Sequence, residues 1–123
     1  MWIKDDMTIR DLQRAFNEKF PFLRIEFYTE PHEPHQGSPA TKQIPPDKKI
    51  GEVRLIHAEG DFRIDPKMKV AELEQLFQEK YGLYVQVFRR SGNLWLQTTA
   101  TDDWTLEEQN EHGRQSVEES ARE

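Results

Sequence analysis

Two stretches of this chain, sixty-one residues apart, align without a gap. Residues 1–22 (MWIKDDMTIRDLQRAFNEKFPF) lie over residues 62–83 (FRIDPKMKVAELEQLFQEKYGL). The identical positions are Ile3/Ile64, Met7/Met68, Leu12/Leu73, Phe16/Phe77, Glu18/Glu79 and Lys19/Lys80. Most of these are apolar or flanking positions of an amphipathic helix, so the pattern indicates one supersecondary unit used twice. We therefore expect two similar units that share a core.

Each copy predicts one amphipathic helix with a recognisable start and end. In the first copy Thr8 is a good N-cap residue, and Asp11 completes a capping box. Pro21 then ends the helix. In the second copy Lys69 is a poor cap, whereas Gly82 supplies the left-handed residue that commonly ends a helix.

Alternating apolar and polar residues predict strands on either side of these helices. The predicted strands are residues 1–4, 23–28, 53–57, 61–65, 83–88 and 94–99. Residues 91–93 (Ser-Gly-Asn) form the predicted turn before the last strand. This order predicts an α+β fold of tandem β-α-β-β units. Its two helices pack on one face of a mostly antiparallel sheet, in a ferredoxin-like or related arrangement.

The second half of the chain also resembles the core of the ubiquitin-like β-grasp fold. A predicted hairpin, a glycine-ended helix and a strand follow one another within residues 51–99. The resemblance implies a β-grasp core at 51–99 with an added helix and strand from the N-terminal part. It carries no expectation about activity, because one fold hosts many functions.

Composition divides the chain into one domain and two solvated segments. Residues 1–104 form the predicted domain, with the repeat at 1–29 and 62–90. The connecting loop 30–49 contains five prolines and is predicted to be flexible. Residues 105–123 are predicted to be an acidic, mostly disordered tail.

Charge and hydropathy restrict the possible partners. Residues 1–100 carry 15 acidic and 15 basic side chains, whereas residues 101–123 carry 8 acidic and 2 basic ones. A neutral body with an acidic tail argues against a protein that binds nucleic-acid backbones. The mean hydropathy is −0.91, and no apolar run approaches the roughly 20 residues that span a bilayer. With no cysteine and no signal peptide, we expect a cytoplasmic protein without a membrane partner.

No pattern in the sequence predicts catalysis or a cofactor. Glycine-rich phosphate loops and nucleophile motifs are absent from the sequence. His32 and His35 are weak candidates for metal ligands, because imidazole suits zinc, nickel or copper. Their proline-rich surroundings hold no fixed geometry, so we expect neither an enzyme nor a bound metal.

Strand parity predicts an interaction face on the side of the sheet that the helices leave open. The side chains expected there are Arg24, Tyr28, Tyr84, Gln86 and Phe88. Aromatic groups on an open sheet bury against a protein partner or stack on nucleic-acid bases. The leading hypothesis is a non-enzymatic protein or peptide interaction module, with an unknown protein partner or self-association. The alternatives are single-stranded nucleic-acid binding on this face, and metal or small-ligand binding through the loop that holds His32 and His35.

Overall fold

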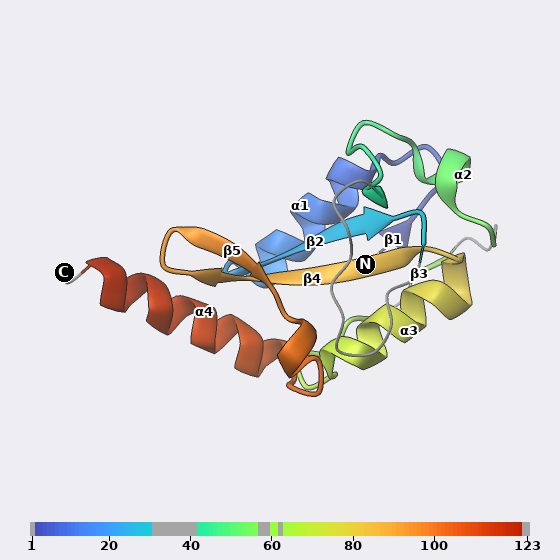
Figure 1. The fold of residues 1–123 in the computed structure, drawn as a ribbon. Helices are drawn as coiled ribbons and strands as arrows, with labels where there is room; N and C mark the ends of the chain where they lie inside the picture. Colours follow the sequence, from blue (N-terminus) through green and yellow to red (C-terminus); the bar gives the residue numbers. More distant parts are fainter. Residues whose placement is uncertain (1, 31–41, 57–59, 62, 122–123) are drawn as a thin grey trace.

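The chain forms an α+β fold in a computed structural model that describes residues 2–30, 42–56, 60–61 and 63–121 (Figure 1). The strands are β1 (Trp2–Ile3), β2 (Leu23–Tyr28), β3 (Gly60–Asp61), β4 (Tyr84–Ser91) and β5 (Leu94–Gln97). The helices are α1 (Ile9–Lys19), α2 (Ile50–Val53), α3 (Val70–Tyr81) and α4 (Leu106–Ala121), with a 3₁₀ turn at Thr99–Thr101. None of the helices in these described ranges is long and apolar enough to cross a membrane.

The main sheet has three antiparallel strands in the order β2–β4–β5. The β2–β4 ladder runs from Leu23 opposite Arg89 to Tyr28 opposite Tyr84. The short strands β1 and β3 pair with each other in a separate ribbon. The ferredoxin-like arrangement of tandem β-α-β-β units is therefore not confirmed, because β1 and β3, the strands that precede α1 and α3, do not join the main sheet.

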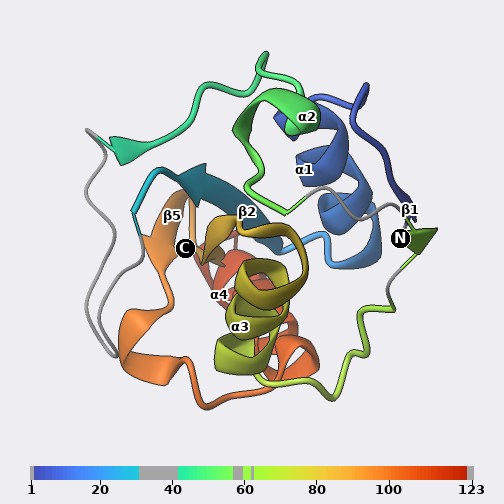
Figure 2. The same cartoon turned by 90° about the vertical axis from the view of Figure 1, so that its right-hand side faces the viewer.

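The core lies between the sheet and the helices. Leu23, Ile25 and Phe27 on β2 are fully buried, and the ring of Phe27 meets that of Phe77 on α3 edge-on at 5.5 Å. Figure 2 shows α1, α3 and α4 on the same side of the sheet. Alternation along β2 thus places one face of the strand in the core and turns the other away from the helices.

The predicted ends of α1 and α3 are confirmed. The hydroxyl of Thr8 accepts from the amide of Asp11 at 3.2 Å, and the carboxylate of Asp11 accepts from the amide of Thr8 at 2.9 Å. Lys69 makes no side-chain cap to α3, as its chemistry suggests. At the other end of α3, Gly82 has a φ of 63°, in the left-handed region.

The helix starts are joined in pairs by reciprocal backbone hydrogen bonds. The amides of Ile9 and Arg10 donate to the carbonyls of Lys48 and Pro46, both at 2.9 Å. In return the amides of α2 donate to the turn before α1, Ile50 to Met7 at 2.8 Å and Gly51 to Asp5 at 3.0 Å. The first amides of a helix have no partner within the helix, so each helix of this pair satisfies those of the other.

The same scheme joins α3 to α4. Val70 and Ala71 donate to Trp104 and Asp102 at 3.0 and 2.9 Å, while Leu106 and Glu107 donate to Met68 and Pro66, both at 2.9 Å. The first helical residue is fully buried in all four helices, namely Ile9, Ile50, Val70 and Leu106. The turn before each helix therefore leads into a buried first residue. Its carbonyls also accept hydrogen bonds from the first amides of the paired helix.

Two predictions about the chain are wrong. Residues 105–123 were expected to be mostly disordered, but 106–121 form α4, which buries Leu106, Gln109 and Gly113. Gln109 packs through polar contacts: its amide donates to Thr101, and its carbonyl accepts from Arg89 at 2.9 Å. Hydropathy missed this helix because much of its buried surface is polar or glycine.

The expected hairpin of strands 53–57 and 61–65 is also not what the structure shows. Val53 ends α2, and β3 pairs with β1. Arg54, at the C-cap of α2, has a fully buried side chain that lies 2.7 Å from the carboxylate of Asp5. This ion pair, together with the short α2, directs the chain away from a hairpin.

Candidate interaction face

The side of the main sheet that α1, α3 and α4 leave uncovered carries the candidate site. We call it the helix-free face. Strand register assigns the following side chains to it: Arg24, Glu26, Tyr28, Tyr84, Gln86, Phe88, Arg90, Trp95 and Gln97. This set contains all five residues expected from the sequence, so the structure brings them together on one surface.

Only part of this face is accessible to a partner. Tyr28 is 2 % exposed and Gln86 is fully buried, and burial raises the pKa of the Tyr28 phenol to about 12. Arg24, Tyr84 and Phe88 are half-buried, and the side chain of Arg24 is 41 % exposed. The accessible part therefore lies toward the end of the sheet where β2 begins.

Two arginines are stacked on aromatic rings at that end. The guanidinium of Arg24 lies 5.1 Å from the ring of Phe88 and 5.1 Å from that of Trp95. The guanidinium of Arg90 lies 5.2 Å from the same Trp95 ring. We call these four residues the arginine–aromatic cluster. A guanidinium held over an aromatic ring by a cation–π contact keeps N–H groups that can donate to an anionic group.

A buried carboxylate supports this cluster from the middle of the face. Glu26 is 8 % exposed, and its Oε2 accepts from the amides of Gln13 at 2.8 Å and Gln43 at 2.7 Å. Its other oxygen lies 3.8 Å from the Nε of Arg24. Burial raises the pKa of the Glu26 carboxyl, and Arg24 and the two amides oppose that shift. The carboxylate of Glu26 is therefore occupied by Gln13, Gln43 and Arg24 and is not exposed to a partner.

A basic hollow adjoins the cluster where α1 meets the outer edge of β2. It has a volume of about 300 Å³. Its lining residues are Arg10, Gln13, Arg14, Asn17, Arg24, Ile25, Glu26 and Trp95. Arg10 and Arg14 are exposed, and within the described residues neither side chain has a hydrogen-bond or ion-pair partner. The nearby Asp11 carboxylate is already bound to the amide of Thr8, which lowers its pKa. The hollow thus presents the guanidinium groups of Arg10 and Arg14, which no neighbouring carboxylate binds within the described residues.

Side chains of α1 cover the outer edge of the sheet beside this hollow. The side-chain amide of Gln13 donates to the backbone carbonyl of Ile25 at 3.0 Å, and the side-chain amide of Asn17 donates to the backbone carbonyl of Leu23 at 2.8 Å. These contacts satisfy backbone groups that an added strand would need. These two contacts therefore disfavour the addition of a strand at this edge.

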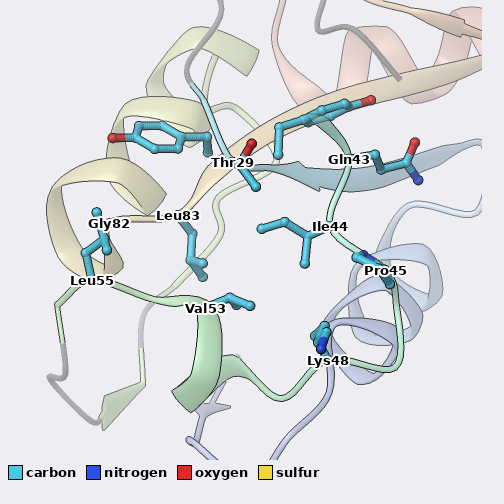
Figure 3. Close-up of a pocket in the computed structure, with 11 residues that line it drawn as sticks. Thr29, Gln43, Ile44, Pro45, Lys48, Val53, Leu55, Gly82 and Leu83 are labelled. Carbon is cyan, nitrogen blue, oxygen red and sulfur yellow. The ribbon is translucent and has the colours of Figure 1, made fainter. Parts of the chain in front are cut away.

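An apolar cavity of about 320 Å³ lies at the opposite end of the face (Figure 3). Its walls come from the end of β2, residues 43–48, α2 and the start of β4. Ile44, Val53 and Leu83 point toward a common space in Figure 3. Tyr28 and Tyr84 also line it, so these two expected residues face a different hollow from Arg24.

Sequence reasoning missed Arg10, Arg14, Arg90 and Trp95. A signal for the last two was available in the predicted turn at 91–93. A two-residue hairpin loop pairs Ser91 with Leu94, which places Arg90 opposite Trp95, as the structure shows. The arginines of α1 carry no such signal, because their position beside β2 depends on how the helix packs.

The weak metal candidates His32 and His35 lie outside the described residues. In the part of the chain that the structure describes, no group of three or more histidine, aspartate or glutamate side chains is placed to hold a metal ion. Comparisons of the chain with protein-family models, with curated proteins and with solved structures find no match. Function is therefore inferred from the geometry of the helix-free face.

Proposed function

We propose that this protein is a non-enzymatic interaction domain that binds an acidic protein or peptide segment. The binding surface consists of the arginine–aromatic cluster and the basic hollow beside it. The observation that carries the proposal is the placement of Arg24 and Arg90 on the Trp95 ring, next to the unpaired Arg10 and Arg14. Arginine and tryptophan are the residue types that most often supply binding energy at protein interfaces.

The chemistry of the surface favours carboxylates as the group that is bound. A guanidinium presents parallel N–H groups that match a carboxylate, and such charge-assisted hydrogen bonds are stronger than neutral ones. Arg24 and Arg90 occupy the ring of Trp95, which weakens the case for nucleic acid, because a base needs a free aromatic face to stack on. The small number of basic groups in the hollow also favours a peptide over a phosphate backbone.

Binding of three labelled probes tests the proposal, followed by fluorescence anisotropy at low and high salt. The probes are a short Glu-rich peptide, a Lys-rich peptide of equal length and a mixed-sequence single-stranded RNA. We expect the Glu-rich peptide to bind, and the double variant Arg24→Gln/Arg90→Gln to bind it about tenfold more weakly, as the loss of a charge-assisted hydrogen bond implies. Arg63→Gln, which alters an exposed arginine outside the surface, is the matched control.

Three results would contradict the proposal. They are the absence of binding to the Glu-rich peptide, equal binding by the double variant, and tighter binding of RNA with a steep salt dependence. The last result would identify single-stranded nucleic acid as the ligand.

A further inference from the structure

Helix α4 has an excess of acidic side chains. This helix carries five carboxylates and a single guanidinium, and all five carboxylate residues are exposed: Glu107, Glu108, Glu111, Glu118 and Glu119. Arg114 binds Glu111 and Glu118 on the same helix. Thr105 binds Glu108 in a capping box. The surface of α4 is thus strongly acidic even after its internal pairs are counted.

The acidic helix and the basic hollow do not neutralise each other within one molecule. Among the residues that the structure describes, no ion pair joins Arg10, Arg14 or Arg24 to α4. One molecule therefore carries two surfaces of opposite charge that no ion pair joins within the described residues.

We propose that the acidic segment recognised by the basic hollow is helix α4 of a second copy of this chain. The inference rests on the proposed function and names its partner. Arg10 and Arg14 lie four residues apart on α1, and Glu107 and Glu111 lie four residues apart on α4. Both pairs have the same spacing, about 6 Å along a helix axis, so the two helices match charge for charge.

Glu107 supplies a carboxylate that has no partner in the described part of the chain. Glu111 already binds Arg114, and an incoming arginine shares its carboxylate. The residues that meet differ on the two sides, so the contact is heterologous and copies associate head to tail. Exposed ion pairs are individually weak and are screened by salt, so the association forms at high protein concentration and low ionic strength.

Sedimentation velocity over a range of protein concentrations tests the inference. For the wild-type chain at low salt we expect the sedimentation coefficient to rise with concentration, and at high salt we expect that rise to disappear. The double variants Arg10→Glu/Arg14→Glu and Glu107→Lys/Glu111→Lys should each stay monomeric. Mixed in equal amounts, they should associate again, because the intact hollow of one variant meets the intact helix of the other and the reversed charges are complementary as well.

Circular dichroism and thermal unfolding establish that both variants are folded. If a charge reversal unfolds the chain, the neutral versions Arg10→Gln/Arg14→Gln and Glu107→Gln/Glu111→Gln take its place and should weaken the association of the wild-type chain. The inference is overturned if the wild-type chain stays monomeric at low salt, or if it associates independently of salt and of both pairs of variants. A wild-type chain that stays monomeric yet binds the Glu-rich peptide would reject self-association and keep the proposed function. A wild-type chain that neither self-associates nor binds the Glu-rich peptide would contradict both this inference and the proposed function.

Discussion

Phe27 and Phe88 lie in neighbouring strands of one sheet and have the same side chain, yet they belong to opposite faces. Phe27 is fully buried against Phe77 beneath the helices. Phe88 is half-buried on the helix-free face and supports the guanidinium of Arg24. Strand alternation thus gives the two faces of the sheet different roles in this chain. One face stabilises the fold, and the other holds charged groups in place at little cost to the core.

The largest expected effect tests that separation directly. Phe27→Ala should lower the free energy of unfolding by about 3–5 kcal/mol, because it leaves a cavity in the core. Phe88→Ala should cost about 1 kcal/mol, since it removes a partly exposed cation–π contact. Urea denaturation of both variants measures the difference. Equal losses would mean that the two faces are not divided in this way.

A second prediction concerns α4, which we place on the helix-covered face. A Cβ at Gly113 would lie 2.9 Å from the Cβ of Phe22 and 3.1 Å from its carbonyl oxygen. Overpacking of this kind costs about 1–3 kcal/mol, whereas alanine gains about 1 kcal/mol in helix propensity over glycine. Gly113→Ala should therefore destabilise the chain, while Gln115→Ala on the exposed side of α4 should be nearly neutral. A more stable Gly113→Ala variant would show that α4 is not docked at Phe22.

A third prediction compares the starts of α1 and α3. Thr8→Ala should cost about 1 kcal/mol, because it removes the side-chain cap on α1. Lys69→Thr should stabilise the chain by a similar or smaller amount, because it adds the missing cap to α3. Thermal unfolding of both variants measures these changes. A destabilised Lys69→Thr variant would mean that the turn before α3 has no room for the threonine hydroxyl.

The smallest expected effect concerns the buried carboxylate of the helix-free face. Burial raises the pKa of Glu26, so the folded chain binds a proton at this group more readily than the unfolded chain. The contribution of Glu26 to stability is therefore greatest below its unfolded pKa and declines as the pH rises through its folded pKa. Relative to the wild-type chain, Glu26→Gln should gain stability over that interval. If the difference in unfolding free energy between the two does not change with pH, the carboxylate is not desolvated as the structure indicates.

Local sequence chemistry was sufficient to predict helices α1 and α3 and the faces of β2 and β4. Thr8 and Asp11 mark the start of α1, Gly82 marks the end of α3, and alternation orients the strands. The duplication of residues 1–29 and 62–90 stays a prediction from the sequence. What these patterns share is that each depends on neighbours within a few positions.

The elements that sequence reasoning missed depend on distant partners. The start of α2 is held by carbonyls that precede α1, and α4 is held by the turn before α3 together with Phe22 and Arg89. Hydropathy gives no sign of such contacts, since Gln109 and Gly113 replace apolar residues on the buried side of α4. The basic hollow was missed for the same reason. Its arginines come from α1 and β2 and meet only after the helix packs on the sheet.

The most direct test of the binding surface is a side-chain NMR titration with the Glu-rich peptide. The indole N–H of Trp95 and the Nε–H groups of Arg24 and Arg90 report on the cluster, and Trp104, which contacts Arg89 and His112, serves as an internal control. We expect the signals of Trp95, Arg24 and Arg90 to shift and saturate at low salt, while that of Trp104 stays in place. No shift at these three groups, or shifts confined to Trp104, would contradict the assignment of this face as the site of interaction.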